Sequence, residues 1–175
     1  MSKPMSVLEA IRKRKSIRKY KPDPVPDEVL GRVLEAARLA PSGKNLQPWK
    51  FIIVRSAETK ERLARASANQ TFLAGAPLII AACGFPEACY AKMGRTMKSW
   101  PVDVSCAVEH LMLQAAAEGL GTCWIGAFEE EAVKEILGVP QEVRVLALTP
   151  LGYPAEDPPS RGRKSMPEIV SDEKY

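Results

Sequence analysis

Residues that bind metals or act as general bases are scarce in this chain of 175 residues. His110 is the only histidine, and none of the four cysteines, Cys83, Cys89, Cys106 and Cys123, belongs to a C-x-x-C pair. We therefore expect no zinc site, because such sites draw on closely spaced Cys and His ligands. No Ser-His-Asp set or pair of carboxylates suggests acid–base or nucleophilic catalysis. Any chemistry is therefore expected to come from a cofactor.

Long apolar runs are also absent. No segment approaches the roughly 20 apolar residues that span a bilayer, and residues 1–4 show no apolar stretch of a signal peptide. With 46% hydrophobic and 26% charged residues, the chain can bury a core. We expect a soluble, cytoplasmic, single domain over residues 1–175, with no membrane partner.

Glycine-rich phosphate loops are missing as well. Gly43-Lys44 has arginine and asparagine where a P-loop needs glycine and Ser or Thr, and Gly119-x-Gly121 has tryptophan where a dinucleotide motif needs its third glycine. A bound phosphate would therefore have to be held by side chains.

Positive charge is concentrated near the N-terminus, where residues 1–21 hold eight Lys or Arg and one acid. Arg14, Lys15, Ser16 and Arg18 follow a short helix, and two readings of them stay open. They are either a solvated helix end, where cations are favoured, or guanidinium forks and a hydroxyl for a phosphate. A second cationic cluster, at residues 161–164, could bind the same phosphate. Nucleic acid is not expected, since no helix-turn-helix or interleaved aromatics accompany the charge.

Amide side chains gather at two further places. The loop before residues 50–54 contains Ser42, Asn45 and Gln47, and Asn69-Gln70 precedes an apolar run. Such residues are typical of turns, but amides also suit the alternating donors and acceptors of a flat heterocycle. Together with the cations, they suggest a phosphorylated ring cofactor.

Hydrophobic periodicity predicts alternating helices and strands. We expect helices from residue 6 to about 15, from Pro26 to about 40, at 58–67, around 104–115 and at 129–137. Strands are expected at 50–54, 77–83 and 143–151, with a short extended piece at 122–126. Residues 84–101 are expected to be irregular, and residues 152–175 form a tail with few core residues.

Several segments, taken together, resemble the nitroreductase-like flavin family. They are RKSIRKY, APSGKNLQPWKFIIV, NQTFLAGAPLII, AAAEGLGTCWIGAF and LGYPAEDPPSRGRK, in the family's order. The resemblance implies an α+β three-layer sandwich, in which helices flank a mixed, mainly antiparallel sheet. It also implies a homodimer with two interfacial FMN sites and a C-terminal tail, residues 152–175, exchanged onto the partner.

The resemblance also implies roles for individual residues. Arg14, Lys15 and Ser16 would hold the phosphate and ribityl end, and Arg18 would lie by flavin N1 and the C2 carbonyl. Gly126 would offer a backbone N–H near N5. The other cofactor-binding residues implied are Pro41, Ser42, Gly43 and Asn45 from the other subunit, Asn69 and Gln70, Trp124, Ile125 and Ala127, and Arg161 and Arg163 from the tail.

The implied activity is that of an FMN-dependent NAD(P)H oxidoreductase. Hydride would pass from NADH or NADPH through flavin N5 to a nitroaromatic, quinone or similar small acceptor, with ping-pong kinetics. Alternatives are reductive dehalogenation or a flavin-consuming reaction on the same fold, or a non-enzymatic flavin- or nucleic-acid-binding protein.

Overall fold

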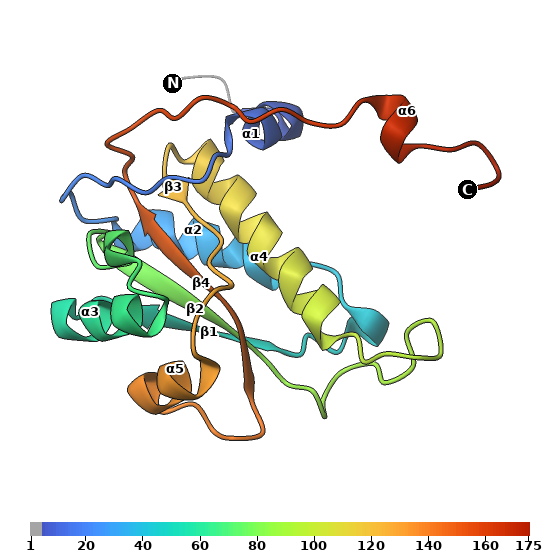
Figure 1. Cartoon of the computed structure of the whole chain (residues 1–175), viewed down its shortest axis with the longest axis horizontal. Coiled ribbons are helices and arrows are strands. Elements are labelled where there is room, and N and C mark those ends of the chain that lie inside the picture. The colour runs from blue at the N-terminus through green and yellow to red at the C-terminus, as the bar shows by residue number, and fades with distance from the viewer. Residues whose placement is uncertain (1–4) are drawn as a thin grey trace.

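The computed structural model describes residues 5–175, so residues 1–4, in which no signal peptide was expected, lie outside it. Helices and strands follow one another in the predicted order (Figure 1). They are α1 Val7–Lys13, α2 Asp27–Arg38, β1 Trp49–Val54, α3 Ala57–Ala66, β2 Leu78–Gly84, α4 Trp100–Ala117, β3 Gly121–Thr122, α5 Glu130–Leu137, β4 Arg144–Gly152 and α6 Met166–Ile169. Two 3₁₀ turns, Gly43–Asn45 and Thr71–Leu73, lie in the loops.

Local sequence signals explain most helix starts. In α1, Ser6 and Glu9 form the capping box that their spacing predicts, because each side chain accepts from the other's backbone N–H, at 3.3 and 2.7 Å. Pro26 precedes the first residue of α2 rather than lying within its first turn. α4 begins at Trp100, so the irregular stretch ends earlier than expected.

The strands form one sheet in the order β1-β2-β4-β3, and each named pair is antiparallel. A parallel bridge between Ser16 and Thr122 adds the N-terminal segment to the β3 edge. The predicted mixed, mainly antiparallel sheet is therefore confirmed. The predicted piece at 122–126 is strand only at its start, followed by a bridge from Ile125 to Leu148.

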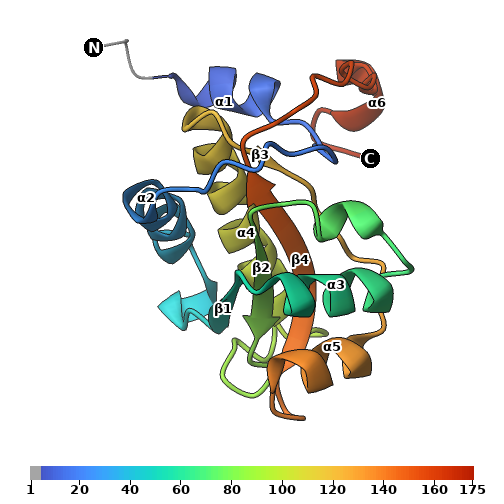
Figure 2. The same cartoon turned by 90° about the vertical axis from the view of Figure 1, so that its left-hand side faces the viewer.

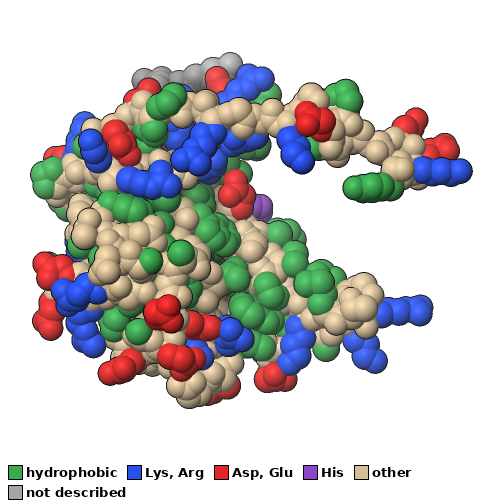
Figure 3. Space-filling model, in the orientation of Figure 1, with side chains coloured by type: hydrophobic (Ala, Val, Ile, Leu, Met, Phe, Trp, Pro, Cys, Tyr) green, Lys and Arg blue, Asp and Glu red, His purple; other side chains and the backbone are tan. Residues whose placement is uncertain are grey.

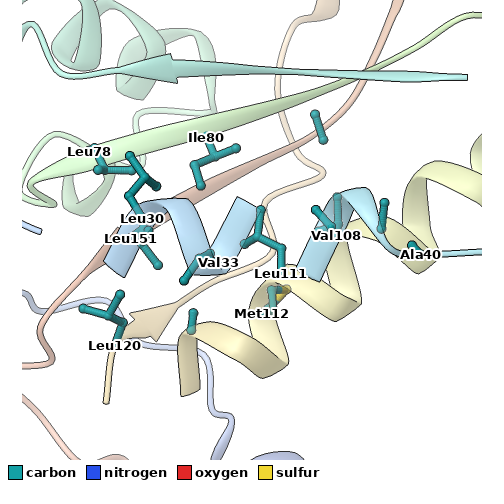
Figure 4. Packing of buried hydrophobic residues seen from close by; sticks show 14 of the residues in the cluster. Leu30, Val33, Ala40, Leu78, Ile80, Val108, Leu111, Met112, Leu120 and Leu151 are labelled. Atoms are coloured by element: carbon teal, nitrogen blue, oxygen red, sulfur yellow. The ribbon is translucent and has the colours of Figure 1, made fainter. Parts of the chain in front are cut away.

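Two hydrophobic cores fill the space on either side of the sheet. α2 and α4 cover one face, where Leu30, Val33 and Leu111 pack against Ile80 and other strand residues (Figure 4). α3 and α5 cover the other face, which gives three layers (Figure 2). All of β2 is buried, because its residues alternate between the two cores. This confirms the predicted sandwich.

The N-terminal segment after α1 lies against the end of the sheet. Ile17 donates its N–H to Thr122 O at 2.8 Å, and Lys21 donates to Tyr153 O at 2.8 Å. Gly121 allows this approach, since a Cβ there would lie 2.7 Å from Ile17 Cγ1. The segment that carries Ser16 and Arg18 is thus fixed by main-chain bonds.

After β4 the tail extends past α1 to α6 (Figure 1). All of residues 159–175 are exposed. The short α6 was not predicted, although Ser165 and Glu168 form a capping box like that of α1. None of the helices within residues 5–175 is both long and apolar enough to cross a membrane.

Candidate functional site

A cleft of about 610 Å³ lies between the end of α1 and the start of the tail. Its lining contains six cationic residues and, within the part of the chain that the structure describes, no acidic one. Such a concentration of one charge attracts anions. The lining residues are Ile11, Arg12, Arg14, Lys15, Ser16, Arg18, Pro158, Pro159, Ser160, Arg161 and Arg163. The structure thus brings both predicted cationic clusters to one place.

Two acidic residues of the tail hold the N-terminal segment at this cleft, one through its backbone and one through a side chain. Glu156 Oε1 accepts the N–H groups of Arg18 and Lys19 at 2.6 and 3.2 Å, and Asp157 lies 2.6 Å from Lys15 Nζ. No ion pair occupies Arg14 or Arg18 among residues 5–175. Their guanidinium groups therefore remain available to a bound anion.

Arg18 connects the cleft to the Asn69-Gln70 turn. Its guanidinium carbon lies 5.8 Å from the centre of the Phe72 ring, two residues after Gln70. Gln70 donates to Ser67 O at 2.9 Å and to Ala127 O at 3.2 Å, so its amide joins the turn to residues 124–127. Asn69, in contrast, is exposed and has a left-handed φ of 55°.

Residues 124–127 lie beyond the Gln70 amide and are mostly exposed. The Ile125 side chain is buried, and its N–H and C=O are paired with Leu148, each at 3.0 Å. Trp124, Gly126 and Ala127 are exposed. A Cβ on Gly126 would meet only Trp124 Nε1, at 3.7 Å, so the backbone there is open to a ligand.

Cys123 is the titratable group buried beneath this surface, close to Ser16, Arg14 and Arg18. Burial raises the pKa of its thiol, against the effect of the arginines, which lower it. The thiol is therefore protonated near neutral pH and is a packing residue rather than a nucleophile.

The loop with Pro41, Ser42, Gly43 and Asn45 lies elsewhere. Gly43 N donates to Asp103, in the first turn of α4, at 2.9 Å. Arg14 instead lines a hollow together with Ala116 and Ala117, in the last turn of α4. Asp103 and Ala116 are 13 residues apart in α4, which separates the two by about 20 Å at 1.5 Å per residue. One chain therefore does not bring this loop to the cleft (Figure 1).

Comparison with known proteins identifies the family. The model of the "Nitroreductase family" matches residues 11–78 and 64–153. The chain belongs to this family. A nitroreductase family protein of Clostridium novyi NT has a similar structure, with a TM-score of 0.81 and 39% identity, covering 87% of each chain. An FMN-dependent nitroreductase from Clostridium difficile R20291 aligns over 96% of this chain and 99% of its own, with a TM-score of 0.83 and 31% identity.

A sequence relative supports the same assignment. It comes from Methanothermobacter thermautotrophicus and is 35% identical over 161 residues, 90% of this chain and 82% of the relative. Its provisional name is NADH dehydrogenase/NAD(P)H nitroreductase. The resemblance seen in the sequence of this nitroreductase family member, and the fold class that it implied, are therefore confirmed.

Sequence reasoning did not single out three residues that support the site. Glu156 and Asp157 look like tail charge, and Asp103 looks like an ordinary acid in the first turn of a helix. Nothing local marks them, because their partners lie 60 or more residues away in the chain. For Phe72, which sequence reasoning also did not single out, a signal was present, since it lies two residues after Asn69-Gln70.

Proposed function

We propose that this chain is an FMN-dependent NAD(P)H oxidoreductase that reduces nitroaromatic, quinone or similar electron-poor acceptors. The observation that carries the proposal is the cationic cleft, which Arg18 joins to a rim of amide and backbone groups. The names of relatives support it, since one is an FMN-dependent nitroreductase and another an NAD(P)H nitroreductase.

The residues present fit FMN. A phosphate monoester carries about −1.5 to −2 charges at neutral pH, which suits a cleft lined by several cations and the Ser16 hydroxyl. Arg14, Lys15 and Ser16 would hold the phosphate and ribityl end, with Arg161 and Arg163 closing from the tail. Asn69, Gln70 and residues 124–127 would border the ring.

FMN, when bound, accepts hydride from NAD(P)H and passes electrons to the acceptor. Arg18 would stabilise negative charge at N1 and the C2 oxygen, as an oxyanion-hole donor does. Gly126 would offer its backbone N–H near N5. Because the rim is open, donor and acceptor would use the same face in turn, which gives ping-pong kinetics.

The site requires a second copy of the chain if the Pro41–Asn45 loop contacts the flavin. The loop and the cleft lie at opposite ends of α4, so one flavin would take its cleft from one subunit and its loop from the partner. We therefore propose a homodimer with two interfacial sites, in which residues 1–175 form a single domain. We also propose a cytoplasmic location, with which the four free cysteines agree.

Exposed apolar side chains support the dimer. In α1, Val7, Leu8 and Ile11 are 73%, 53% and 48% exposed, and Met166 and Ile169 of α6 are 66% and 62% exposed. Figure 3 shows the arm of residues 159–175 extending over a deep concavity beside the body. A partner subunit would fill this concavity and receive the arm.

The decisive experiment is an anaerobic titration of the purified protein. A yellow protein should bleach on addition of NADH or NADPH and recover its colour with a nitroaromatic or quinone. Bleaching without recovery by these acceptors, but with recovery by a halogenated aromatic, would favour dehalogenation. A colourless protein that takes up no FMN would refute the proposed function.

A further inference from the structure

The loop around Gly43 has a strained backbone. Lys44, Asn45 and Gln47 have φ angles of 53°, 58° and 49°. Residues other than glycine adopt this left-handed region uncommonly, and it is unfavourable for them. The loop makes hydrogen bonds of its own, such as Gln47 N–H to Ser42 Oγ at 2.9 Å, and contacts from outside add to them.

The Asp103 carboxylate supplies the main polar contact. Asp103 Oδ1 accepts the Gly43 N–H at 2.9 Å, and Oδ2 accepts the Ser99 hydroxyl at 2.6 Å. Ser99 Oγ in turn accepts the Tyr90 N–H at 3.1 Å. A single chain of hydrogen bonds thus joins the irregular segment before α4, the start of α4 and the loop.

This arrangement differs from an ordinary acid at a helix start. An N-cap side chain accepts an N–H of its own first turn, but Asp103 is the fourth residue of α4, beyond the N-cap Ser99, and its two carboxylate oxygens accept from Gly43 and Ser99. The side chain is buried, with 5% of the residue exposed, and no cation pairs with it among residues 5–175. Its position at the positive end of the 18-residue α4 stabilises the charge instead.

Glycine is the only residue type that fits at position 43. A Cβ on Gly43 would lie 2.8 Å from Tyr90 Cβ and 3.2 Å from Ser99 Oγ. Lys44 then turns outward with its ammonium nitrogen 5.2 Å from the centre of the Tyr90 ring. The loop is therefore packed against Tyr90 on one side and bonded to Asp103 on the other.

We propose that Asp103 is a positioning residue, which holds the strained Ser42–Gln47 loop in the conformation that it presents to the flavin of the partner subunit. The part of this proposal that concerns the flavin rests on the proposed function. Asp103 itself touches neither FMN nor substrate in this proposal. It acts through Gly43, and Ser99 completes the contact by satisfying the second carboxylate oxygen.

The test is amide hydrogen exchange of the full chain, measured by mass spectrometry with and without FMN. Without flavin, Asp103→Ala should accelerate exchange in residues 42–47 by on the order of tenfold or more, because a bond to a charged acceptor is lost. Asp103→Asn keeps an acceptor oxygen for Gly43 N and should restore most of the protection. Ser99→Ala should give a smaller acceleration.

Ser56→Ala is the matched control. It removes the N-terminal cap of α3, where Ser56 Oγ accepts the Thr59 N–H, and should destabilise the chain to a similar degree. In Ser56→Ala, amide exchange in residues 42–47 should stay as in the wild type, whereas the amides of α3 should exchange faster. If Asp103→Ala fails to fold, Asp103→Asn and Ser99→Ala carry the comparison.

A second readout links the loop to the cofactor. In the flavin-loaded protein, Asp103→Ala should change the visible circular dichroism of FMN and weaken its affinity on the order of tenfold, and Ser56→Ala should do neither. Unchanged loop exchange in Asp103→Ala, or equal acceleration in Ser56→Ala, overturns the proposal. Altered exchange with unchanged flavin spectra overturns its cofactor part. If even the wild type binds no FMN, the proposed function fails, while the exchange data still decide whether Asp103 holds the loop.

Discussion

Arg18 combines a fixed backbone with a free side chain. Its N–H is bonded to Glu156 at 2.6 Å, while its guanidinium lies over the Phe72 ring without an acidic partner among the described residues. A guanidinium that is held in place but not neutralised can stabilise charge that appears nearby during a reaction. Arg18 differs in this respect from Lys15, whose ammonium is already paired with Asp157.

Replacing Arg18 by alanine should slow flavin reduction more than it weakens flavin binding. The other cations of the cleft remain to hold the phosphate, but the charge that grows on the ring loses its partner. We expect the rate of reduction by NAD(P)H, followed anaerobically as loss of flavin absorbance, to fall on the order of 10²-fold. The FMN dissociation constant should change far less.

Arg55→Ala is the matched control for this variant. Arg55 pairs with Asp27 next to β1, at the sheet edge opposite β3. Its loss should therefore leave the rate of flavin reduction and the FMN dissociation constant unchanged. An Arg18→Ala protein with wild-type reduction rates, or with an equal loss in binding and reduction, would contradict the role given to Arg18.

At the scale of elements, the sequence predicts what depends on neighbours in the chain. The capping box of Ser6 and Glu9 and the apolar run of β2 are local signals, and both elements form as expected. The bonds of Gly43 to Asp103 and of Arg18 to Glu156 join residues 60 and 138 positions apart. No propensity or periodicity encodes such pairs, so the positioning of the site was not predictable, although its residue types were.

Gly121 shows how one element positions another. Alanine there would place a methyl group 2.7 Å from Ile17 Cγ1, so the segment carrying Ser16 and Arg18 would have to move away from β3. We expect Gly121→Ala to weaken FMN binding on the order of tenfold and to cost about 1–3 kcal/mol of stability. Flavin titration and thermal unfolding would measure the two effects.

Gly31→Ala provides the comparison with the same chemical change. Gly31 lies in α2 with no atom within 4 Å of a Cβ, so alanine should raise stability by about 0.5–1 kcal/mol and leave FMN affinity alone. A Gly121→Ala protein that binds FMN like the wild type would show that the contact of Ile17 with β3 does not position the cleft.

At the scale of the whole molecule, the separation of the loop from the cleft makes the dimer testable. One variant, Arg14→Ala with Lys15→Ala, damages the cleft, and another, Ser42→Ala with Asn45→Ala, damages the loop. Each homodimer should be nearly inactive. In a heterodimer, one site would receive the intact cleft of the second variant and the intact loop of the first. Two-fold symmetry then predicts about half of the wild-type activity per dimer.

Co-expression with two different affinity tags allows this heterodimer to be purified in two steps. A dimer assembled in the same way from two differently tagged cleft variants serves as the control and should stay inactive, since neither of its clefts is intact. A heterodimer that is no more active than its parents would mean that each flavin is held by a single chain. That result would contradict the shared site, in which the loop at Gly43 comes from the partner because α4 keeps the loop and the cleft of one chain about 20 Å apart.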